Sequence, residues 1–163
     1  TPEVGDGTEI WRLVRELDAL ELNSAYSYLM FCKFFPKTCV IAELDGEVAG
    51  FVFAFRPQTA SDTVFVLQVG VDNTLHGRGV GIALLHTLLV REECRDVRFL
   101  EATVTPSNMP SQALFRKLAR RLDTQCHVSP CFSSDQFPGN EHEDELLFRI
   151  GPFESIGKRR SNQ

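Results

Sequence analysis

The chain has 163 residues, of which 43% are hydrophobic and 24% are charged, and these proportions exclude the collagen-like and intrinsically disordered classes. No apolar stretch approaches the roughly 18 residues that a membrane-spanning helix needs, so no membrane partner is expected. The 17 Lys and Arg residues against 22 Asp and Glu give a net charge of -5, which disfavours nucleic acid as a partner and favours a small cationic substrate.

The first part of the chain predicts two helices and a β-hairpin. Apolar residues spaced by three and four predict a helix that starts at capping residues 6–8 and ends near Leu20. A second helix is expected over 23–34, because Pro36 cannot continue it. Residues rich in β-formers on both sides of Asp45-Gly46 predict two antiparallel strands joined by a tight turn.

The remaining chain predicts a strand, helix, parallel strand unit followed by a basic helix. The strand at 64–71 is nearly all apolar, except for Gln68, and is followed by a glycine-rich turn. A helix at 80–90, a strand at 97–104 and a helix at 109–122 come next, and the last strands are expected at 124–128 and 146–150. We therefore expect one α/β domain over residues 1–153, with a mixed central sheet and flanking helices, and a disordered tail over 154–163.

The turn at 76–81, His76-Gly77-Arg78-Gly79-Val80-Gly81, lies between a buried strand and a helix. Backbone N–H groups at such a turn attract phosphate oxygens, and glycine leaves them uncovered. A Walker A loop is excluded, because no Lys-Ser or Lys-Thr follows. Two other interpretations stay open: a dinucleotide fingerprint, with Glu101 about 20 residues further on, and a tight turn that binds nothing.

The five cysteines are scattered and form no C-x-x-C pair, so they predict neither a disulfide framework nor a zinc site. No metal is expected. They indicate reduced thiols and hence a cytoplasmic protein. The segment Thr1–Gly7 lacks the charged and apolar regions of a secretory signal, so none is expected there.

The order of these elements resembles the GNAT superfamily of acyl-CoA-dependent N-acetyltransferases. The superfamily's loop pattern Gln/Arg-x-x-Gly-x-Gly/Ala falls on residues 76–81, and its second signature falls on Asn108, Ser111 and Phe115. His76 stands where Arg or Gln is usual, and Phe115 stands where many members carry the tyrosine that reprotonates the departing thiolate. The resemblance therefore implies a GNAT-like fold in which another group supplies that proton. The strand expected before the first helix is missing or very short.

A narrower resemblance, to the L-2,4-diaminobutyrate acetyltransferase family, covers almost the whole chain. It is carried by the segments 21–29, 65–69, 100–108 and 142–152, with Glu21 in place of the commoner Asp and Leu67 in place of the commoner Trp. The resemblance implies transfer of acetyl from acetyl-CoA to the γ-amino group of L-2,4-diaminobutyrate, a step of ectoine biosynthesis. It also implies a homodimer.

The acceptor must lose a proton before it can react. An alkyl ammonium has a pKa near 10.4, about 3.4 units above pH 7, which corresponds to roughly 4.6 kcal/mol. The resemblance makes Glu101 a substrate-binding and catalytic residue, His142 the group near the acetyl sulfur, and Glu21, Tyr26 and Gln68 substrate-binding residues. The alternatives are a solvent-facing strand residue for Glu101, a surface histidine for His142, and a helix cap and a core-edge tyrosine for Glu21 and Tyr26.

The cofactor side is inferred from the superfamily. Main-chain groups of Val69 and Val71 are expected along the pantetheine arm, and Asn108 and Ser111 are expected to face it, with helix capping as their alternative role. The predicted cofactor-binding residues are Val69, Val71, His76, Gly77, Arg78, Gly79, Val80, Gly81, Asn108 and Ser111. The basic residues at 116–121 are expected to form a solvated face, with contact to the ribose phosphate as the alternative. Direct acetyl transfer needs no cysteine nucleophile.

Two other functions stay open. The first is a GNAT acetyltransferase for a polyamine or another diamino acid. The second is a non-catalytic acyl-CoA-binding sensor, which the absence of a tyrosine at position 115 allows.

Overall fold

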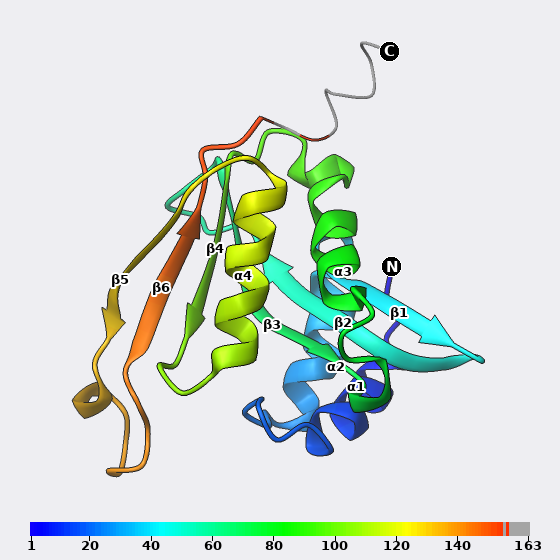
Figure 1. Cartoon of the computed structure of the whole chain (residues 1–163). Coiled ribbons are helices and arrows are strands. Elements are labelled where there is room, and N and C mark those ends of the chain that lie inside the picture. Colours follow the sequence, from blue (N-terminus) through cyan, green and yellow to red (C-terminus); the bar gives the residue numbers. More distant parts are fainter. Residues whose placement is uncertain (155, 157–163) are drawn as a thin grey trace, which may run out of the picture.

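A sheet with the strand order β1-β2-β3-β4-β6-β5 runs through the centre of the computed structural model, which describes residues 1–154 and 156 (Figure 1). Neighbouring strands are antiparallel except for β3 and β4, which are parallel as predicted. The strands are β1 (Val40–Leu44), β2 (Glu47–Phe55), β3 (Thr63–Val71), β4 (Phe99–Val104), β5 (Cys126–Phe132) and β6 (Glu145–Ile150). The α-helices are α1 (Asp6–Arg15), α2 (Ala25–Phe34), α3 (Val80–Leu89) and α4 (Met109–Arg121).

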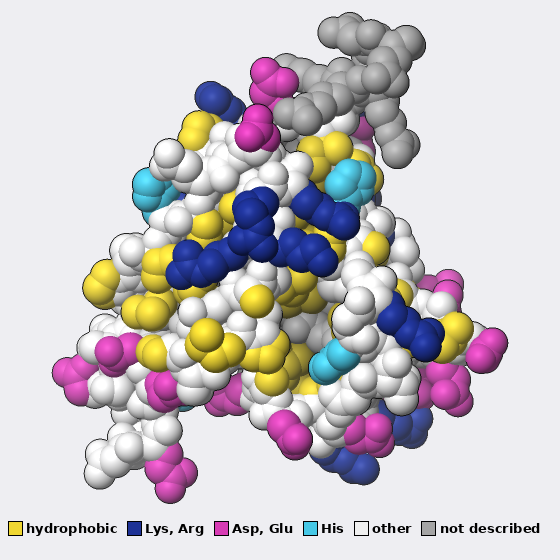
Figure 2. All heavy atoms as spheres, in the orientation of Figure 1, with side chains coloured by type: hydrophobic (Ala, Val, Ile, Leu, Met, Phe, Trp, Pro, Cys, Tyr) yellow, Lys and Arg dark blue, Asp and Glu magenta, His cyan; other side chains and the backbone are white. Residues whose placement is uncertain are grey.

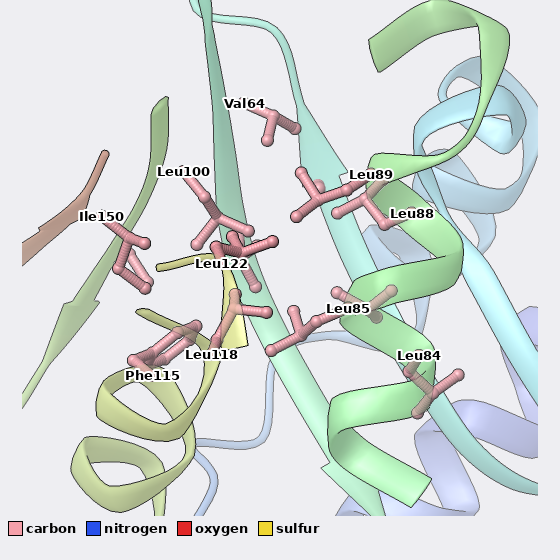
Figure 3. Close-up of a cluster of buried hydrophobic side chains, with 14 of the residues drawn as sticks. Val64, Leu84, Leu85, Leu88, Leu89, Leu100, Phe115, Leu118, Leu122 and Ile150 are labelled. Atoms are coloured by element: carbon pink, nitrogen blue, oxygen red, sulfur yellow. The ribbon is translucent and has the colours of Figure 1, made fainter. Parts of the chain in front are cut away.

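Helices cover both faces of this sheet, which confirms the predicted α/β fold class. The helices α3 and α4 lie on one face, where Leu85, Leu88, Phe115 and Leu118 point toward buried strand residues such as Leu100 (Figure 3). The helices α1 and α2 pack on the opposite face against β2, around a second buried cluster. Among the described residues, no helix is both long and apolar enough to cross a membrane.

The predicted hairpin is confirmed, whereas the first helix is shorter than predicted. Asp45 and Gly46 both have positive φ, at 55° and 83°, as a two-residue hairpin turn requires. The helix α1 ends at Arg15 rather than near Leu20, and no side chain caps its first residue. Residues 16–24 therefore form a separate segment, the α1–α2 connection. No strand precedes α1 among the described residues.

The parallel strands β3 and β4 separate before they end. They pair only from Thr63 to Val66 and from Phe99 to Ala102. Beyond that point the register of β3 with β2 shifts, because Ala54 faces Val66 and Phe53 faces Gln68. Leu67 is therefore the extra residue of a β-bulge, a device that bends a strand away from its neighbour. Residues of both strands beyond the paired part, Leu67, Gln68, Thr103 and Val104, line a cavity.

Most of the predicted tail, 154–163, lies outside the described residues. Only Glu154 and Ile156 of this segment are described.

Candidate active site

A first cavity of about 510 Å³ lies where β3, the glycine turn, α4 and the α1–α2 connection meet. We call it the cofactor cavity, because it contains nearly all of the residues predicted to bind one. The predicted residues that line it are Val69, Val71, His76, Gly77, Gly79, Val80, Gly81, Asn108 and Ser111. Arg78 does not line it.

The glycine turn presents bare backbone to the cofactor cavity. Gly77 and Gly79 have φ values of 76° and 81°, and a Cβ atom at either position would meet no atom within 4 Å. Gly79 is also the N-cap of α3, and it provides no side chain to bond the first N–H groups of that helix. The turn therefore offers a helix N-terminus and open space to a phosphate group. This geometry fits the pyrophosphate of coenzyme A.

Two of the polar side chains predicted beside the cofactor, those of His76 and Asn108, also make bonds within the protein. A ring nitrogen of His76, Nε2, lies 2.9 Å from the carbonyl oxygen of Val71, which ties the turn to the end of β3. Asn108 caps α4, because its Oδ1 accepts a hydrogen bond of 3.2 Å from the N–H of Ser111. Its Nδ2 donates to the carbonyl of Ala19, at 3.3 Å. The capping role considered for Asn108 is therefore present.

A second cavity of about 650 Å³, the acceptor cavity, adjoins the first. Five residues line both cavities: Asp18, Ala19, Leu20, Asn108 and Pro110. Its other lining residues include Gln68, His142 and the acidic residues Glu21, Glu141, Glu143 and Glu145. No Lys or Arg of the described chain is among its lining residues. A cavity of this charge attracts a ligand that carries ammonium groups.

His142 lies between two carboxylates in the acceptor cavity. Its Nε2 is 3.6 Å from a carboxylate oxygen of Glu21 and 3.8 Å from one of Glu145. Its Nδ1 lies 2.6 Å from the carbonyl oxygen of Glu143, which only accepts, so Nδ1 carries a hydrogen and Nε2 is the proton acceptor of the neutral ring. The ring is stacked on Phe137, with centroids 3.7 Å apart. The bond to Glu143, together with the charges of Glu21 and Glu145, raises the pKa of His142.

Glu145 is a site residue that the sequence did not indicate. Burial raises the pKa of its carboxyl group, although the Thr103 hydroxyl, which bonds it, and the nearby His142 act in the opposite direction. Its side chain is 18% exposed, and it is the first residue of β6. Raised pKa values of two groups in one cleft are typical of a functional site.

Two predicted substrate residues lie elsewhere. Glu101 does not line the acceptor cavity and forms an ion pair with Arg149 of β6, whose guanidinium lies 3.8 Å over the ring of Phe99. Tyr26 is 71% exposed and lines neither cavity. The structure thus brings Glu21, Gln68 and His142 together and leaves Glu101 and Tyr26 outside. Their roles stay predictions.

The remaining candidate groups can be placed as well. Lys and Arg side chains gather over α4, and Lys117 among them lines the cofactor cavity (Figure 2). Phe115 is 2% exposed and packs toward Phe148 in the core, so it faces neither cavity. Burial raises the pKa of Cys39 to about 12, so this thiol is protonated and a poor nucleophile.

Sequence comparison agrees with this geometry. A model of the acetyltransferase (GNAT) family matches residues 8–119. The L-2,4-diaminobutyric acid acetyltransferase of Marinococcus halophilus is 54% identical over 152 residues, which are 93% of this chain and 88% of that protein. The enzyme of the same name from Nocardia farcinica is 44% identical over 93% of this chain and 78% of its own. The chain belongs to the GNAT family, among the L-2,4-diaminobutyric acid acetyltransferases.

Solved structures share its fold. The diaminobutyrate acetyltransferase EctA from Paenibacillus lautus, solved with its substrate L-2,4-diaminobutyric acid and coenzyme A, superposes with a TM-score of 0.90 at 42% identity. The match covers 96% of this chain and 95% of that one. Ard1 from Thermoplasma volcanium superposes with a TM-score of 0.71 at 18% identity, which concerns the fold alone. The predicted family is confirmed.

Proposed function

We propose that this GNAT protein transfers acetyl from acetyl-CoA to the γ-amino group of L-2,4-diaminobutyrate, giving Nγ-acetyldiaminobutyrate for ectoine biosynthesis. One observation carries the proposal: the glycine-lined cofactor cavity shares five lining residues with an adjoining cavity that is lined by five carboxylates and one histidine. The two ammonium groups of diaminobutyrate suit that charge. Acetyl-CoA would supply the activated thioester, with its pyrophosphate at Gly77 and Gly79 and its pantetheine arm along Val69 and Val71.

His142 is the proposed base. The γ-ammonium loses its proton to Nε2 of His142, and the imidazolium formed is stabilised by the flanking carboxylates of Glu21 and Glu145. The free amine then attacks the thioester carbonyl, and the carbon–sulfur bond breaks to release the thiolate. Loss of the ammonium proton near pH 7 costs roughly 4.6 kcal/mol in water, and a base that already lies in the cavity lowers that barrier.

The same histidine can return a proton to the departing sulfur. Phe115 has no proton to give and is buried away from both cavities. Protonated His142 holds the proton taken from the ammonium, and its transfer to the thiolate restores the neutral ring. The acylated nitrogen loses its second proton to water, so the overall reaction releases one proton to solvent and forms no covalent enzyme intermediate.

The carboxylates of the acceptor cavity are proposed to hold the substrate. Glu21 and Glu145, whose carboxylates both lie within 4 Å of Nε2 of His142, are the first candidates for the two ammonium groups. Glu101 and Tyr26 are proposed as more distant contributors only, since neither lines the cavity. Glu101 would act by holding β4 against β6 through Arg149.

Thiol release tests this function. Purified protein, acetyl-CoA and diaminobutyrate are expected to release free thiol at a rate well above that of an amine-free control, and NMR of the product should place the acetyl group on the γ-nitrogen. Thiol release at the level of that control, or acetylation of the α-nitrogen, would refute the proposal.

A polyamine acceptor is the second candidate, because the described part of the acceptor cavity contains no cation to bind a carboxylate. An acceptor panel with putrescine, spermidine, ornithine and diaminobutyrate separates the two by kcat/KM. The acyl-CoA sensor predicts binding of acetyl-CoA by calorimetry with no thiol release from any acceptor.

A homodimer and a cytoplasmic location are proposed with the same function. Val128 and Phe132 on the outer strand β5 are 39% and 49% exposed, which suits burial against a second copy. None of the five cysteines is in a disulfide, which suits a reducing compartment. Light scattering on the purified protein tests the dimer, and a fractionation of the source cells tests the location.

A further inference from the structure

The α1–α2 connection, residues 16–24, crosses the junction of the two cavities. Its residues Asp18, Ala19 and Leu20 line both cavities, and Glu21 and Asn23 line the acceptor cavity. A segment in this position sets the shape of both sites, so whatever fixes it affects the reaction.

Side-chain amides from three separate elements donate to carbonyl groups of this connection. Gln68 of β3 donates to Glu21 at 2.7 Å, Asn108 before α4 donates to Ala19 at 3.3 Å, and Asn73 after β3 donates to Glu16 at 3.4 Å. Gln68 makes the shortest of the three bonds.

Both ends of the Gln68 amide are engaged within the protein. Its Oε1 accepts a hydrogen bond of 3.1 Å from the hydroxyl of Tyr28, which is 1% exposed. The same hydroxyl accepts the N–H of Asn23 at 3.3 Å. Gln68 therefore joins the buried part of α2 to the segment that carries Glu21, across 47 residues of sequence.

The part of β3 on which the α1–α2 connection packs has a glycine, Gly70. A Cβ atom at Gly70 of β3 would lie 3.0 Å from Cδ1 of Leu20 and 3.1 Å from Cδ1 of Leu17. The absence of a side chain at this position lets the connection pack directly on the β3 backbone. Apolar packing and the amide bonds thus fix the same segment.

We propose that Gln68 is a positioning residue, which holds the main chain at Glu21 so that the Glu21 carboxylate faces His142 and the acceptor amine. The assignment rests on the proposed function and replaces direct substrate binding by Gln68. It explains why a polar residue lies in the otherwise apolar stretch 64–71 of β3. Gln68 acts on the substrate only through Glu21.

Two substitutions remove the two hydrogen bonds of the Gln68 amide one at a time. Gln68→Glu keeps an oxygen for Tyr28 but removes the donor to Glu21, whereas Tyr28→Phe keeps that donor and removes the hydroxyl. Gln68→Glu is expected to raise KM for diaminobutyrate about three- to tenfold, the loss typical of one hydrogen bond, with a smaller change in kcat. Gln58→Leu, on an exposed loop, is the control for loss of a glutamine and should change neither.

A double-mutant cycle distinguishes positioning from independent roles. If Gln68 acts through Glu21, Gln68→Leu should lower kcat/KM much less in a Glu21→Gln background than in the wild type. Losses that multiply, as for independent residues, would overturn the proposal.

Hydrogen exchange tests the positioning without any turnover. Backbone amides of residues 20–23 should exchange at least several times faster in Gln68→Leu than in the wild type, while those of β2 are unchanged. Unchanged exchange at residues 20–23 would refute the positioning role even in an active enzyme. Absence of diaminobutyrate turnover in the wild type would instead refute the proposed function, so the two failures are distinguishable.

Discussion

Substitution of Gly79 by alanine tests the proposed binding of phosphate by the glycine turn. Gly79 has a φ of 81°, a region in which an L-residue is less stable by about 1–2 kcal/mol. No atom lies within 4 Å of the added methyl group, so it causes no clash within the protein. The methyl group would instead project toward the space that the pyrophosphate needs. We expect Gly79→Ala to weaken coenzyme A binding at least tenfold, beyond its effect on stability.

Gly46 provides a matched control for backbone strain. It has a φ of 83°, equally open surroundings and a place in the β1–β2 turn, and it lines neither cavity. Both alanine variants should lose a similar 1–2 kcal/mol, or about 2–4 °C in Tm for each kcal/mol. Calorimetry with coenzyme A should then separate them, with only Gly79→Ala losing affinity. Equal affinity of the two variants for coenzyme A would refute the proposed binding of pyrophosphate by the glycine turn.

Three other substitutions address the acceptor side and the thiols. Glu21→Gln removes an anion that raises the pKa of His142, so the acid limb of the kcat/KM profile should move to lower pH; an unmoved limb would exclude this coupling. Glu145 has a raised pKa in the folded state, so its contribution to stability falls as the pH rises through that pKa. The Tm of Glu145→Gln should therefore rise relative to the Tm of the wild type as the pH is raised from 4 to 8. A fall of the variant's Tm relative to the wild type over this range would contradict the burial argument. Cys131→Ala, at the exposed cysteine, should leave thiol release from acetyl-CoA unchanged, because the proposed transfer uses no enzyme thiol, and a loss of activity would contradict it.

Local signals in the sequence were sufficient for most of the fold. The Asp45-Gly46 turn and the β-forming residues on both sides of it predicted the hairpin, and the nearly all-apolar pattern at 64–71 predicted the strand there. The end of α1 was wrong by five residues, because the apolar residues Leu17 and Leu20 continue the helical spacing but pack on bare backbone at Gly70 instead. That contact joins segments about 50 residues apart, so no local pattern contains it.

Site residues whose positions follow from the order of elements along the chain could be predicted from the sequence. Site residues whose positions depend on which strands pair could not. The glycine turn follows its strand directly, so its position could be predicted. Glu101 and Glu145 show the opposite case. Arg149 pairs with Glu101 only because β6 lies antiparallel to β4, and the same pairing brings Glu145 to Thr103 at the acceptor cavity. Within the acidic run 141–145, the local signal for Glu145 was its place at the start of a strand, directly before Leu146.

Substitution of Phe115 by tyrosine is not expected to increase kcat. Many superfamily members have tyrosine at the corresponding place, so Phe115→Tyr would restore their thiolate proton donor if the side chain reached the sulfur. In this structure Phe115 is 2% exposed, and its ring centroid lies 6.4 Å from that of Phe148. A hydroxyl there would be buried among apolar groups, which costs about 1–3 kcal/mol when it finds no partner.

We therefore expect Phe115→Tyr to lower Tm by about 2–4 °C for each kcal/mol lost, with kcat unchanged or reduced. Phe34→Tyr, which adds the same hydroxyl at a position 68% exposed, should change neither quantity. An increase in kcat for Phe115→Tyr at an unchanged Tm would mean that residue 115 does approach the thioester. In that case His142 would no longer be needed as the proton donor, and the single-residue proton relay would be wrong.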